Sequence, residues 1–133
     1  MENFEISVDK EHLDDYGHVN HAAYLELFEE ARWDYLAKRG YARSWVVENQ
    51  KGPVVLEANI KYRKEVLPEE IVHIETELLA HDKPILMNAH QKMYKADGKT
   101  LAAEIDLLFG MMDLQKRRLM AVDGQLAEDL FRK

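Results

Sequence analysis

The sequence DDYGHVNH at positions 14–21 leads directly into a long run of helical periodicity at residues 22–39. Apolar residues in that run recur every three or four positions, which is the spacing of one buried helix face. They are Tyr24, Leu27, Phe28, Ala31 and Tyr35. Gly40 follows the run, as glycine commonly does just past the end of a helix. The sequence therefore predicts a helix about 27 Å long, enough to cross a small sheet.

Outside that helix, alternating apolar and polar residues predict strands. We expect strands at residues 4–8, 54–63, 71–80, 85–94 and 100–112, with an edge strand at 119–122. The buried side of the second strand is expected to be Val54, Leu56, Ala58, Ile60 and Tyr62. Asp97-Gly98 is a two-residue hairpin signal. Shorter helical segments are expected at residues 44–50 and 127–132.

One long helix followed by hairpin-linked strands predicts an α+β fold, in which the helix covers one face of an antiparallel sheet. A chain of 133 residues fits a single domain spanning residues 1–133. Because open sheet edges are unfavourable in a small domain, we expect two sheets to pair in a homodimer.

Composition narrows the classes of function. The net charge of −7 argues against nucleic-acid binding, which depends on lysine and arginine. No apolar run approaches the roughly 20 residues of a membrane-spanning helix, so membrane insertion is not expected. The chain has no cysteine, and its first residues show no secretory signal. These features favour a cytoplasmic protein.

The residues just before the long helix bring a carboxylate, a glycine and an imidazole to its N-terminus. Unpaired backbone N–H groups there favour developing negative charge, which acyl transfer requires. Asp14 can act as a general base or as a nucleophile, and the residues alone leave both open. Gly17 allows a positive φ or a close approach of ligand. Asp14 and Asn20 are also typical of loops and helix caps, and His18 of structural hydrogen bonding.

The pattern that extends from Asp14 through Gly17, His21 and Tyr24 to Glu29-x-Ala31-Arg32 closely resembles the signature of hotdog-fold acyl-CoA thioesterases. The resemblance is to the 4-hydroxybenzoyl-CoA thioesterase type, with its Tol-Pal-associated and long-chain acyl-CoA branches. It implies an antiparallel sheet wrapped around one long central helix, and homodimers or homotetramers with active sites at subunit interfaces. It implies hydrolysis of acyl-CoA, or of acyl carrier protein thioesters, with no cofactor beyond the coenzyme A of the substrate.

The resemblance also implies site residues. Asp14 matches the catalytic carboxylate, and His21 matches a position that supplies an imidazole and a backbone donor to the thioester carbonyl. The residues expected to bind substrate are Gly17, His18, Asn20 and Tyr24. Apart from the resemblance, the charge pattern adds Arg63 and Lys64 as candidates for the basic surface that coenzyme A needs. One departure is Lys64-Glu65, where family members often carry a proline. Tyr24 is equally explained as a core or pocket-wall residue, and Glu29 with Arg32 as an ion pair on the helix surface.

Three further functions compete with this hypothesis. A metal site could use His12, Asp14, His18 and His21, but these residues lack the repeated spacing of helical ligands, so no metal is expected. The second competing function is a non-catalytic acyl-binding module, and the third is an enoyl-CoA hydratase of the same fold. Both stay open because a fold does not fix a function.

Overall fold

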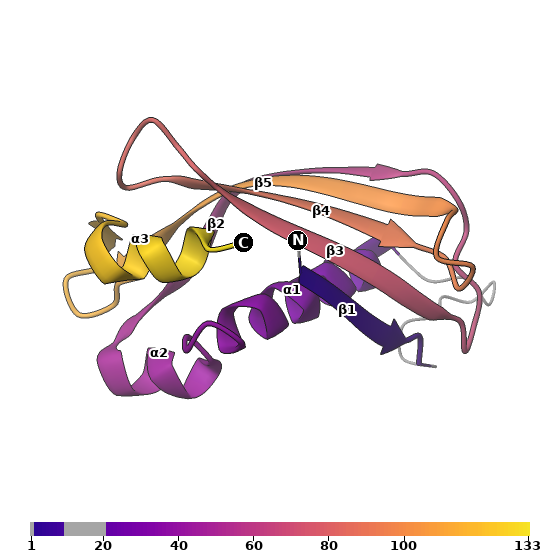
Figure 1. Ribbon diagram of the computed structural model, residues 1–133, viewed down its shortest axis with the longest axis horizontal. Helices are drawn as coiled ribbons and strands as arrows, with labels where there is room; N and C mark the ends of the chain where they lie inside the picture. Colours follow the sequence, from indigo (N-terminus) through magenta and orange to yellow (C-terminus); the bar gives the residue numbers. More distant parts are fainter. Residues whose placement is uncertain (1, 10–20) are drawn as a thin grey trace.

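The computed structural model describes residues 2–9 and 21–133 (Figure 1). Its elements are β1 (Glu2–Ser7), α1 (His21–Ala37), α2 (Arg43–Asn49), β2 (Lys51–Tyr62), β3 (Ile71–Ala80), β4 (Met87–Tyr94), β5 (Leu101–Asp113), β6 (Arg118–Met120) and α3 (Gly124–Phe131). Each predicted helix and strand is present, with most ends shifted by a few residues. Within the described residues, no helix is long and apolar enough to cross a membrane.

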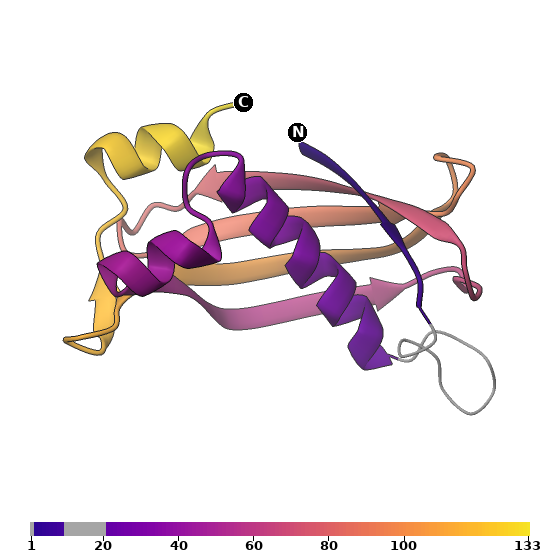
Figure 2. The same ribbon diagram turned by 90° about the horizontal axis from the view of Figure 1, so that it is seen from below.

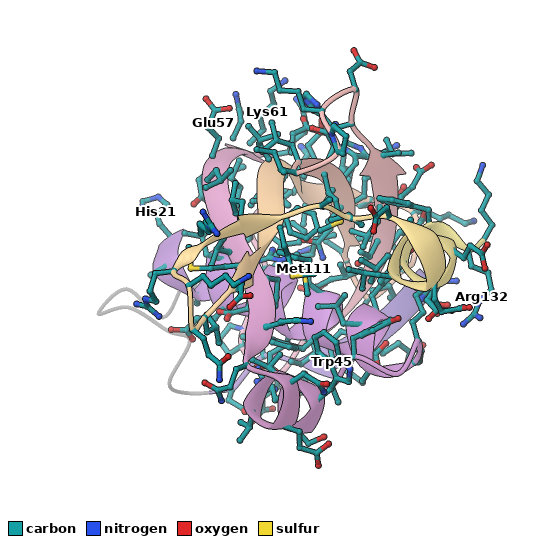
Figure 3. The ribbon with its side chains drawn as sticks, turned by 90° about the vertical axis from the view of Figure 1, so that its left-hand side faces the viewer. His21, Trp45, Glu57, Lys61, Met111 and Arg132 are labelled. Carbon is teal, nitrogen blue, oxygen red and sulfur yellow. The ribbon has the colours of Figure 1, made fainter. Side chains whose placement is uncertain are left out.

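The long strands form one antiparallel sheet in the order β1-β3-β4-β5-β2, and β6 pairs with β5. Helix α1 crosses one face of this sheet diagonally, and α2 lies on the same side (Figures 1 and 2). In Figure 3, Glu57 and Lys61 project from the sheet on the side away from the helices. The sheet therefore has a helix-facing side and an outer side, as the α+β prediction requires.

The core lies between α1 and the middle strands of the sheet. All five α1 residues selected by periodicity are buried, and Leu27 and Phe28 are almost completely so. They belong to one apolar cluster with residues of the sheet such as Ile74, Met93 and Ile105. Burying a large apolar side chain contributes about 1.5–3 kcal/mol. This cluster therefore anchors α1 to β3, β4 and β5.

Strand β2 corrects one part of the prediction. Val55 lies opposite Phe109, but Glu57 lies opposite Leu108, so Leu56 is the extra residue of a β-bulge. The bulge shifts the alternation by one residue. Val55 therefore shares the helix-facing side with Ala58, Ile60 and Tyr62. The expectation that Val54 lies on that side was wrong, because an unbroken apolar stretch hides the register shift.

The β4–β5 hairpin is present, but its loop is longer than the two residues predicted. The amide of Lys95 donates to the carbonyl of Thr100, which leaves residues 96–99 in the loop. Gly98 has a φ of +70°, and its amide donates to the carbonyl of Lys95. The carboxylate of Asp97 accepts from the backbone amides of Lys99 and Thr100. The Asp-Gly pair thus builds the turn without closing it alone.

Candidate active site

The N-terminus of α1 meets the end of β2. Tyr62, the last residue of β2, donates its hydroxyl to the carbonyl of His21 at 3.3 Å. The two rings pack edge to face with centroids 5.1 Å apart. Because the first N–H groups of an α-helix have no intrahelical partner, this contact holds a set of backbone donors beside the strand end.

Tyr24 lies one turn into α1 and completes this aromatic group. Its ring packs edge to face on Tyr62 at 5.1 Å, and its hydroxyl accepts from the amide of Val66 at 3.3 Å. Burial raises the pKa of Tyr24, so the hydroxyl stays neutral near pH 7. Tyr24 is 5% exposed and belongs to the apolar core. His21, by contrast, is exposed at the helix end.

Arg63 and Lys64 follow Tyr62 at the turn out of β2. Their backbone amides both donate to the carbonyl of Ala102, at 2.8 and 3.0 Å. The side chain of Arg63 pairs with Glu104 at 3.4 Å. Glu104 lies opposite Lys61 in the β2–β5 register, which places this pair on the outer side of the sheet. The structure therefore brings Tyr62, and not the Arg63 guanidinium, to His21. Lys64 is exposed.

A cavity of about 70 Å³ lies farther along α1, between the helix and the sheet. Its walls are mostly apolar and come from α1, β2, β3 and β5. They are Glu29, Arg32, Trp33, Tyr35, Leu36, Pro53, Val55, Leu78 and Phe109. Glu29 and Arg32 are the charged residues of this set. The cavity therefore combines a hydrocarbon-like surface with one cation and one anion.

Arg32 is held by a buried polar network. Its Nη1 donates to Oε1 of Gln91 at 2.9 Å, and Nε2 of Gln91 donates to the carbonyl of Phe28 and to Oγ1 of Thr76. Gln91 and Thr76 are fully buried and directly opposite each other on β4 and β3. Burial lowers the pKa of Arg32, while the carboxylate of Glu29 acts in the opposite direction.

The family model of the thioesterase-like superfamily matches residues 8–130 of this chain. The chain belongs to the thioesterase-like superfamily. It is 31% identical over 126 residues to the long-chain acyl-CoA thioesterase FadM of Escherichia coli K12, covering 95% of this chain and 94% of that protein. The antiparallel sheet crossed by α1 is the hotdog fold of this superfamily, which confirms the fold expected from the sequence.

Solved structures show the same likeness. The probable thioesterase YbaW of Escherichia coli superposes with a TM-score of 0.81 at 30% identity, over 96% of this chain and 95% of that one. A hypothetical protein of Aquifex aeolicus superposes with a TM-score of 0.87 at 20% identity, over 98% and 99% of the two chains. The gentisyl-coenzyme A thioesterase BH1999 gives a TM-score of 0.85 at 16% identity, over 97% and 99%. The last two likenesses concern the fold alone.

Several predicted site residues lie outside the described residues, namely Asp14, Gly17, His18 and Asn20. Of the four residues in the metal-site hypothesis, His21 is the one that the structure describes. Within residues 2–9 and 21–133, no group of three histidine, cysteine or acidic residues is arranged to hold a metal ion.

The contacts of two residues, Tyr62 and Arg32, were not predicted from the sequence. Tyr62 was assigned to a buried strand face, and nothing local predicts that it reaches His21. Arg32 was expected to pair with Glu29 on the helix surface. In the described part of the chain its hydrogen-bond partner is instead Gln91. The available signal was Gln91 itself, a polar residue among the apolar positions of β4.

Proposed function

We propose that this protein hydrolyses acyl-CoA thioesters at the N-terminus of α1, with Asp14 as general base or nucleophile. As a member of this family with thioesterase relatives, the chain is an acyl-CoA thioesterase. In the general-base form, Asp14 takes a proton from water as the water oxygen attacks the thioester carbon. The carbon–sulfur bond then breaks, and the coenzyme A thiolate takes up the proton that Asp14 received, which restores the carboxylate. In the nucleophilic form, the carboxylate of Asp14 attacks the thioester carbon and expels the coenzyme A thiolate, which leaves a mixed anhydride. Water then opens the anhydride to give the free acid and restore the Asp14 carboxylate.

The observation that carries this proposal is the arrangement of the α1 N-terminus against β2. Negative charge develops on the thioester oxygen, and the backbone N–H groups at His21 are suited to donate hydrogen bonds to it. Losing one such donor typically costs about 2.7–4 kcal/mol of transition-state stabilisation. The hydroxyl of Tyr62 binds the carbonyl of His21 and so fixes the orientation of this end.

The substrate contacts form the second part of the proposal. We expect Gly17, His18, Asn20 and Tyr24 to bind the acyl thioester, and the exposed Lys64 together with Arg63 to bind the phosphates of coenzyme A. Coenzyme A enters as part of the substrate, and no other cofactor or metal takes part. The reaction takes place in the cytoplasm, which the lack of cysteine suits.

The acyl group that this proposal favours is a long chain. FadM, which is 31% identical to this chain over 126 residues, is named a long-chain acyl-CoA thioesterase. The helix-facing side of β2 also remains open toward solvent, because Val55 and Tyr62 keep 50% and 44% of their surface exposed. Together with Ala58 and Ile60, they line a strip from the cavity to the α1 N-terminus. An extended hydrocarbon chain would cover this apolar strip.

The free edge of β2 supports a homodimer. Strand β2 ends the strand order and pairs with β5, so its other edge is unpaired within the described residues. Leu56, the bulged residue of β2, is exposed at 46%. A second copy that adds its β2 in antiparallel orientation would satisfy the edge by a two-fold symmetric contact. Two such dimers could then form the homotetramer.

The test is a hydrolysis screen with short, long and aromatic acyl-CoA substrates, in which released thiol is measured. We expect activity with long-chain substrates and loss of at least 100-fold in kcat for Asp14→Asn (about 2.7 kcal/mol or more). Asp15→Asn is the matched control and should retain activity. Wild-type rates in purified Asp14→Asn would contradict the role of Asp14. Loss of enoyl absorbance without thiol release would contradict hydrolysis itself.

A further inference from the structure

The cavity beside α1 is lined by one cationic group, the guanidinium of Arg32. Within the described residues, no carboxylate oxygen lies within 4.0 Å of this guanidinium, and Gln91 takes one of its donors. An arginine guanidinium carries five N–H donors. Removing such a group from water is unfavourable unless its donors are satisfied. Arg32 can therefore bind an acceptor oxygen that enters the cavity.

Gln91 fixes the direction of this guanidinium. Its two amide donors are used by the carbonyl of Phe28 and by Thr76, so its oxygen must face Arg32. Because Gln91 and Thr76 are fully buried, neither can rotate toward solvent. This is the support that a recognition site needs, since a donor held in place loses little freedom on binding.

Glu29 is the second charged residue that lines the cavity. It lies about one helical turn before Arg32 and lines the same cavity. A guanidinium is a donor only, and a carboxylate is an acceptor only. A hydroxyl group satisfies both, since its oxygen accepts from Arg32 while its O–H donates to Glu29. A ketone would use Arg32 alone, and a carboxylate would pair with Arg32 but would face a like charge at Glu29.

The position of the cavity sets where this hydroxyl lies on the substrate. Arg32 follows His21 by about three helical turns, which places it about 16 Å along the α1 axis. The open strip of Val55, Ala58, Ile60 and Tyr62 joins the two places. An acyl group bound with its thioester at His21 therefore needs a long chain to bring its far end to Arg32.

We infer that this enzyme recognises long-chain acyl-CoA substrates that carry a hydroxyl group near the far end of the chain. Arg32 is the specificity-determining residue, Glu29 is the second hydrogen-bond partner, and Gln91 with Thr76 positions Arg32. The inference rests on the proposed function, because it requires the thioester to bind at the N-terminus of α1.

The test compares two substrates of equal length, ω-hydroxyhexadecanoyl-CoA and hexadecanoyl-CoA. We expect wild-type kcat/KM to be about tenfold higher or more for the hydroxylated substrate, the effect of one hydrogen bond to a charged group. An ω-carboxylated substrate of the same length should be poorer than the hydroxylated one, because Glu29 repels it.

Variants separate recognition from structure. Arg32→Met should abolish the preference for the hydroxyl group while it retains hydrolysis of hexadecanoyl-CoA, and Arg32→Lys should restore part of the preference. Glu29→Gln should raise kcat/KM for the ω-carboxylated substrate, which a purely structural role of Glu29 would not do. Lys92→Met, beside Gln91 but on the outer side of β4, is the control and should leave all ratios unchanged.

The outcomes distinguish this inference from the proposed function. Equal kcat/KM for the two substrates in the wild type overturns the inference and leaves the hydrolase intact. A preference that survives Arg32→Met also overturns it. If neither substrate is hydrolysed, the proposed function fails. Binding of the two free acids, measured as a rise in Tm, then tests the inference. A larger rise in Tm with ω-hydroxyhexadecanoic acid than with hexadecanoic acid supports it, and equal shifts overturn it.

Discussion

The two sides of α1 differ in how they meet the sheet. Toward β3 and β4, the helix buries Leu27 and Phe28 in a closed apolar core. Toward β2, Val55 and Tyr62 stay about half exposed, and a cavity remains beside Arg32. The same helix thus stabilises the fold with one side and leaves the other side available for a ligand. Stability and substrate recognition should therefore respond to different substitutions.

The largest expected effect is on the closed side. Phe28→Ala removes a fully buried ring and should lower the free energy of unfolding by about 3–5 kcal/mol, measured by urea denaturation. Val55→Ser on the open side is the matched comparison and should change it by about 0.5 kcal/mol or less. Equal losses in the two variants would remove the distinction between the sides.

The polar network is expected to have an intermediate effect. Gln91→Leu leaves the Arg32 guanidinium, the Phe28 carbonyl and Thr76 without their common partner. A buried group left unsatisfied costs about 1–3 kcal/mol, so Tm should fall clearly. Double-mutant cycles between Gln91 and Thr76 should give a coupling energy. Additive losses would show that the two residues act separately.

At the open end of α1, a smaller loss is expected. Tyr62→Phe removes the hydroxyl that binds the His21 carbonyl but keeps both ring contacts. The hydrogen bond is exposed, so stability should fall by about 0.5–1.5 kcal/mol at most. Its effect on kcat should exceed its effect on KM if Tyr62 orients the helix end. A change confined to KM would contradict that role.

The smallest effect concerns the loop between β4 and β5. Hydrogen bonds from Thr100 and Lys99 lower the pKa of Asp97 from 3.8 to about 2. Because the folded-state pKa lies below the unfolded value, Asp97 stabilises the fold above about pH 4, and this contribution is lost as pH falls toward 2. The Tm difference between wild type and Asp97→Asn should shrink over that range. A constant difference would contradict the assignment.

The residues that α1 buries in the core could be predicted from the sequence. The contacts beside β2 and Arg32 could not. The period of Tyr24, Leu27 and Phe28 predicts the buried helix face, and β3 has the limits predicted from alternation. The bulge at Leu56 changes the register between two strands, and no local pattern marks it. The hydrogen bond from Arg32 to Gln91 joins residues 59 positions apart, so it follows from the packing of α1 on β4 and not from local spacing.

The most direct test is a crystal structure of the Asp14→Asn variant with hexadecanoyl-CoA bound. We expect the thioester oxygen to lie against the amides at the start of α1 and the acyl chain to follow the helix-facing side of β2 toward Arg32. An acyl chain on the outer side of the sheet, or a thioester remote from His21, would contradict it.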